Sequence, residues 1–115
     1  MKNYKIDVVT NVGRSFRAVL IPTGGQSDNY NLGVAKESMI EFYDLTHSHT
    51  RDGQFTGARY YVSTLMDSRG WNPIKAQNGI NLNGGVSDWV IDHETFENIL
   101  DWVHNLLYNL EINSS

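Results

Sequence analysis

The fold is decided by the stretch Ile80-Asn81-Leu82-Asn83-Gly84-Gly85-Val86-Ser87-Asp88-Trp89-Val90-Ile91-Asp92 and by the segment 93–110 that follows it. In that segment, apolar residues recur at the i, i+3, i+4, i+7 spacing of an amphipathic helix: Phe96, Ile99, Leu100, Val103, Leu106, Leu107 and Leu110. Asp92 is placed to accept backbone N–H groups as the N-cap, and Glu94 adds a favourable negative charge to the first turn. Because an isolated helix of this length is marginal in water, its apolar stripe requires a facing surface.

The preceding segments predict the sheet that supplies this surface. Residues 4–8, 15–21, 39–45 and 54–66 have the alternation or the β-prone bulk of strands, and residues 11–14 are expected to close a hairpin. Gly57 indicates a bulge or a close backbone approach, and Gly84-Gly85 indicates a tight hairpin turn between residues 80–83 and 86–91. The sequence therefore predicts an α+β fold, with an antiparallel sheet of five or six strands and a C-terminal helix packed on one face.

Bulk properties restrict the class of protein. A chain of 115 residues is expected to form one domain, 1–115, with two irregular loops at 23–36 and 67–78. The formal net charge of −4 argues against a protein that wraps nucleic acid, and the lack of cysteine excludes disulfides and thiolate metal sites. No apolar run predicts a membrane span, and the N-terminal segment predicts a strand, so a cytoplasmic location is expected.

Sites for catalysis or for metal have weak support in the sequence. His47 and His49, together with Asp44 and Asp52, have the ligand types that zinc prefers, but solvated or capping histidines explain the same pattern. The sequence contains no nucleophile elbow, HExxH or Walker motif. We expect neither a cofactor nor a catalytic site.

Aromatic residues are more suggestive of a ligand site. Trp71 lies in a loop beside Arg69 and Asn72, and this combination offers a π-face for a base and a cation for phosphate. The alternative for Trp71 is a loop anchor folded onto the core. Trp102 and Tyr108 lie beside the main helix stripe and widen the apolar surface, which favours self-association.

Two blocks carry a resemblance to a known family: Asp52-Gly53-Gln54-Phe55-Thr56-Gly57-Ala58-Arg59-Tyr60-Tyr61-Val62-Ser63-Thr64-Leu65, and Leu82-Asn83-Gly84-Gly85-Val86-Ser87-Asp88-Trp89. With the C-terminal helix that carries Trp102, they resemble the small phage-encoded Thoeris anti-defence sponge proteins. The resemblance implies a homo-oligomeric protein that sequesters a cyclic ADP-ribose-type signal, without cleaving it, in the infected bacterial host cell. It also implies pockets between protomers.

The ligand residues expected from this resemblance are Arg59 in the first block and Asn83 in the second. Residue chemistry adds Trp71, Arg51 and Arg69 as candidates. Two alternatives remain open: an inhibitor that acts by protein contact, as anti-CRISPR proteins do, and a small hydrolase that uses His47, His49 and nearby acids.

Overall fold

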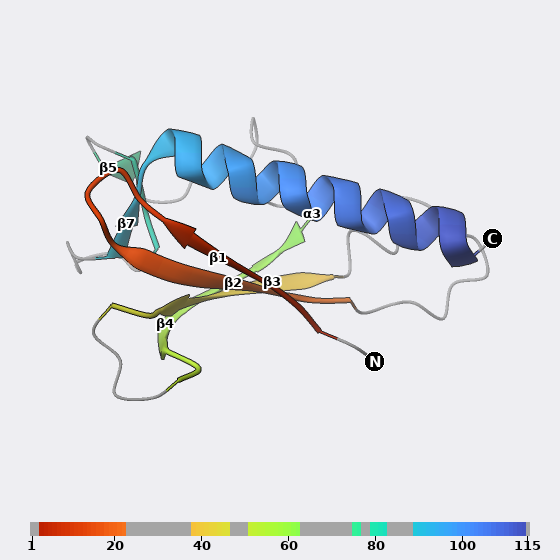
Figure 1. The fold of residues 1–115 in the computed structure, drawn as a ribbon, viewed down its shortest axis with the longest axis horizontal. Coiled ribbons are helices and arrows are strands. Elements are labelled where there is room, and N and C mark those ends of the chain that lie inside the picture. The colour runs from red at the N-terminus through yellow and green to blue at the C-terminus, as the bar shows by residue number, and fades with distance from the viewer. Residues whose placement is uncertain are drawn as a thin grey trace.

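A four-stranded antiparallel sheet forms one layer of the protein, and a long helix lies across one face of it (Figure 1). This computed structural model describes residues 3–22, 38–46, 51–62, 75–76, 79–82 and 89–114. The strands are β1 (Tyr4–Val9), β2 (Ser15–Ile21), β3 (Met39–Asp44) and β4 (Gln54–Tyr61), and they follow one another in the sheet in the order of the sequence. The α+β class expected from the sequence is confirmed.

The hairpin between β1 and β2 forms where the sequence predicts it. The Thr10 N–H donates to the Arg14 carbonyl at 2.8 Å, and the Gly13 N–H donates to the Thr10 carbonyl at 3.0 Å. Gly13 has a φ of +81°, which a residue with a side chain rarely adopts. The turn sets the register in which Asp7 pairs with Arg17.

The pairing of β3 with β4 contains the irregularity that Gly57 predicts. Glu41 pairs with Arg59 and Tyr43 pairs with Phe55, so one residue on β3 faces three on β4. Gly57 lies inside this bulge with a φ of +87°. With this bulge, Phe55 lies opposite Tyr43 and Arg59 lies opposite Glu41. The strand β4 ends at Tyr61, before the end at residue 66 that the sequence predicts.

A second, smaller sheet corrects the predicted number of strands. The strands β5 (Lys75–Ala76), β6 (Gly79–Asn81) and β7 (Val90–Ile91) pair antiparallel with one another, separately from the main sheet. The main sheet therefore has four strands, and the expected single sheet of five or six strands is wrong. Within the small sheet, a Cβ atom at Gly79 would lie 2.2 Å from the Ile91 carbonyl oxygen. Such close backbone approach fixes β6 against the end of β7.

The helix α3 (His93–Ser114) begins at the predicted cap and continues past the predicted end at residue 110. Asp92 Oδ2 accepts the Thr95 N–H at 3.1 Å, and the Asp92 carbonyl accepts the Phe96 N–H at 3.0 Å. These bonds satisfy donors that a helix start leaves open.

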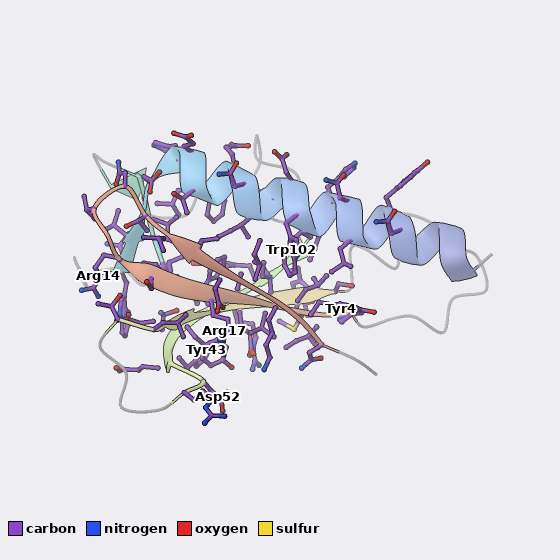
Figure 2. The ribbon with its side chains drawn as sticks, in the orientation of Figure 1. Tyr4, Arg14, Arg17, Tyr43, Asp52 and Trp102 are labelled. Atoms are coloured by element: carbon purple, nitrogen blue, oxygen red, sulfur yellow. The ribbon has the colours of Figure 1, made fainter. Side chains whose placement is uncertain are left out.

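The core lies between α3 and the facing side of the main sheet. Its buried apolar residues are Phe16, Ala18, Leu20, Ile40, Phe42, Ala58, Val62, Ile80, Leu82, Ile91, Phe96, Ile99 and Val103. The Phe42 and Phe96 rings stack with centroids 6.2 Å apart, so the helix and the sheet contact each other directly. Leu100 is half-buried rather than buried. Trp102 is half-buried and packs against this core (Figure 2).

Candidate ligand-binding site

The face of the main sheet opposite α3, called here the outer face, carries the candidate site. Side chains alternate along each strand, so those between the core positions point away from the helix. In Figure 2, Arg17 and Tyr43 lie on the side of the sheet away from α3. We define the outer face by these residues: Lys5, Asp7, Arg17, Val19, Glu41, Tyr43, Phe55, Arg59 and Tyr61.

A polar cluster of Glu41, Tyr43 and Arg59 occupies the β3–β4 side of the outer face. Arg59 Nε donates to Glu41 Oε2 at 2.6 Å, and Arg59 Nη2 donates to the same oxygen. Tyr43 Oη donates to Glu41 Oε1 at 3.1 Å. Glu41 is 5% exposed, whereas the Arg59 side chain is 54% exposed. The guanidinium is thus fixed on its inner edge, while its outer edge faces solvent.

Aromatic rings flank this guanidinium. The Arg59 Cζ atom lies 5.9 Å from the centroid of the Phe55 ring, within the range of a cation–π interaction. The Phe55 ring also contacts Tyr43, with the centroids 5.3 Å apart. Phe55 and Tyr61 are 42% and 54% exposed, which is high for large apolar side chains. They offer π-surface on either side of Arg59 along β4.

The hydroxyl of Tyr43 is held in its protonated form by its surroundings. Burial raises the pKa of Tyr43 above its ordinary value, and the hydrogen bond to the Glu41 carboxylate raises it further. A neutral phenol remains a hydrogen-bond donor. Tyr43 therefore donates a hydrogen bond to Glu41 without adding a charge of its own.

The second arginine of the outer face, Arg17, is already paired. Arg17 Nε and Nη2 donate to the two carboxylate oxygens of Asp7 at 2.7 and 3.0 Å, and Asp52 lies 3.9 Å away. The hydrogen bond from Arg17 lowers the pKa of Asp7. Because Asp52 lies near the other edge of its guanidinium and only 19% of its side chain is exposed, Arg17 has less capacity than Arg59 for a further anion.

Two of the five predicted ligand residues are among the residues that the structure describes. Arg59 lies on the outer face, and Arg51 is exposed in the turn before β4. Asn83, Trp71 and Arg69 lie outside the described residues.

Sequence analysis did not assign Glu41, Tyr43, Phe55 and Tyr61 to the site. Alternation along residues 39–45 and 54–61 places them on a common face only when the register between the two strands is known. No sequence pattern gave that register.

Two members of the proposed histidine–carboxylate metal site, Asp44 and Asp52, are described, and Asp44 has another role. Asp44 is 1% exposed and accepts hydrogen bonds from Arg14 Nη2 at 3.1 Å, Trp89 Nε1 at 3.0 Å and the Thr46 N–H at 2.8 Å. Asp44 thereby joins the β1–β2 turn, the end of β3 and the residue before β7. Within the described ranges, no group of three or more His, Cys, Asp or Glu residues is arranged to hold a metal ion. His47 and His49 lie outside those ranges.

Comparison with protein-family models, with curated proteins and with solved structures found no match to this chain. In the part of the chain that the structure describes, no helix is both long and apolar enough to cross a membrane.

Proposed function

We propose that this protein binds and sequesters a cyclic ADP-ribose-type signalling nucleotide without cleaving it, as an anti-defence protein of a phage. The observation that carries the proposal is the Arg59 guanidinium, which is fixed by Glu41 and exposed beside the Phe55 ring. The family resemblance of the β4 block supports the same ligand class.

The roles of the residues follow from their chemistry. The outer edge of Arg59 donates charge-assisted hydrogen bonds to a phosphate of the ligand. Phe55 and Tyr61 provide surface on which an adenine stacks, since a base gains about 1–3 kcal/mol from an aromatic platform. Arg51, Trp71, Arg69 and Asn83 are further proposed contacts. The proposed assembly is a homo-oligomer.

The proposal is tested by native mass spectrometry of protein purified from cells that make the signal. We expect a protein–ligand complex with a mass increment equal to one or more intact nucleotides. Heat denaturation should then release the nucleotide unchanged, which separates a sequestering protein from a hydrolase. A protein that carries no small molecule, and that acquires none when incubated with cyclic ADP-ribose isomers, would contradict the proposal.

A second candidate function is inhibition by protein contact. The exposed pair Phe55 and Tyr61, on the same strand as Arg59, favours it, because aromatic residues and arginine dominate the energetics of protein interfaces. This function predicts that Phe55→Ala weakens inhibition of a protein target while the purified protein binds no nucleotide.

A further inference from the structure

We infer that Glu41 acts as an internal counter-anion, which limits how strongly the Arg59 site binds anions. The inference rests on the proposed function for the nucleotide ligand, but it applies to any phosphate-bearing ligand of this site. It concerns the balance of charge at one guanidinium, which the positions of Glu41 and Tyr43 determine.

The geometry makes Glu41 a permanent neighbour of Arg59. Glu41 lies on β3 directly opposite Arg59 on β4, and its carboxylate receives both the Nε and the Nη2 donors of the guanidinium. Its second oxygen accepts the Tyr43 hydroxyl at 3.1 Å. With 5% exposure, Glu41 has little access to solvent that would screen its charge.

Two effects of Glu41 on an anionic ligand oppose each other. The carboxylate orients the guanidinium, which favours binding because less side-chain freedom is lost. It also repels the phosphate that approaches the outer edge of the same guanidinium, a few ångströms away. Arg17 adds little compensating charge, because Asp7 and Asp52 lie against it.

The two effects can be separated by substitution. Glu41→Gln is nearly isosteric and keeps an oxygen that accepts from Arg59, so it retains most of the orientation while removing the charge. Loss of the repulsion should tighten phosphate binding about three- to tenfold, because the Coulomb energy of two charges roughly 6 Å apart corresponds to about threefold in affinity at the dielectric constant of bulk water and to about tenfold at half that value. Glu41→Leu removes the charge without supplying an acceptor, and should also tighten binding, by less.

The experiment titrates inorganic phosphate into isotope-labelled protein and follows the Nε–Hε resonance of Arg59 by NMR. Asp7→Asn is the matched control, since it removes a carboxylate from the same face but three strands away from β4. We expect Glu41→Gln to bind phosphate about three- to tenfold more tightly than wild type at low ionic strength, with the gain shrinking in high salt. Asp7→Asn should change the affinity by less than about twofold.

The outcomes distinguish this inference from the proposed function. Equal or weaker phosphate binding by folded Glu41→Gln, or by folded Glu41→Leu if the first variant does not fold, overturns the inference. If these variants bind phosphate more tightly but no protein binds a cyclic ADP-ribose isomer in calorimetry, the role of Glu41 stands and the proposed function fails. If wild type binds the nucleotide and the variants bind phosphate no better, the proposed function stands without the role of Glu41.

Discussion

Asp92 Oδ1 accepts a hydrogen bond from the Asn11 backbone N–H at 3.0 Å, although the two residues lie 81 positions apart in the chain. The same carboxyl group receives the Thr95 hydroxyl at 2.8 Å and the Thr95 N–H at 3.1 Å. One side chain thus caps α3 and attaches the start of the helix to the turn between β1 and β2. The helix is positioned over the sheet by this bond as well as by apolar packing.

The Asp92 carboxylate should make stability dependent on pH. Burial alone would raise the pKa of Asp92, but the hydrogen bonds from Asn11 and Thr95 outweigh burial and lower it. Because the pKa of Asp92 is lower in the folded state than in the unfolded state, its carboxylate stabilises the fold at pH values above the unfolded-state pKa of about 3.9. This stabilisation is lost as the pH falls through the folded-state pKa. Asp92→Ala should therefore cost about 0.5–2 kcal/mol near neutral pH, and less in acid.

Chemical denaturation at about pH 7 and about pH 3 measures this difference. Glu94→Gln is the control, because Glu94 is an exposed acid in the same first turn. If Asp92→Ala lowers the free energy of unfolding by the same amount at both pH values, the charge of Asp92 has no part in holding the β1–β2 turn to the helix.

Gly79 should tolerate alanine far less well than Gly13 does. Both glycines have positive φ, but an added Cβ at Gly13 meets nothing within 4 Å, whereas at Gly79 it meets the Ile91 carbonyl oxygen at 2.2 Å. Gly13→Ala should cost about 1–2 kcal/mol from backbone strain. Gly79→Ala should cost more, because β6 must move away from β7. Equal shifts in the denaturation midpoint would contradict the close approach.

The hydrogen bond from Trp89 to the buried Asp44 should contribute measurably to the free energy of unfolding. Trp89→Phe keeps an aromatic ring but removes the Nε1 donor, which leaves the buried Asp44 with one donor fewer. The expected loss is about 1–3 kcal/mol in the free energy of unfolding. Tyr61→Phe is the control on an exposed side chain and should change this free energy by less than about 0.5 kcal/mol. A Trp89→Phe protein as stable as the control would place Asp44 outside the contacts that hold the molecule together.

The local elements of this fold are readable from its sequence. The cap at Asp92, the helix stripe, the β1–β2 turn and strand β2 follow from periodicity and from turn chemistry over short distances. The bulge at Gly57 follows from a glycine inside a strand pattern.

The pairing and packing of segments that are distant in the sequence could not be predicted in this way. Residues 79–81 and 90–91 have strand character, but no local property says that they leave the main sheet. Trp102 lies beside the main helix stripe, and periodicity alone does not show that it packs, half-buried, against the core. The site shows the same limit, because Arg59 was identified from its own chemistry while its partners Glu41 and Phe55 depend on the pairing of β3 with β4.

The central claim is that the outer edge of Arg59 binds the phosphate of a nucleotide signal, and calorimetry with a cyclic ADP-ribose isomer tests it most directly. Arg59→Ala leaves the buried Glu41 without its cation, so the substitution is made both alone and in the Glu41→Gln background, with the fold checked by circular dichroism. Arg17→Ala removes a paired guanidinium from the same face and is the control. We predict that loss of Arg59 weakens binding by about 1.5–3 kcal/mol, roughly 10- to 150-fold, in either background, and that Arg17→Ala weakens it far less. Undiminished binding by folded Arg59→Ala proteins, or no binding by wild type to any isomer, would contradict the account.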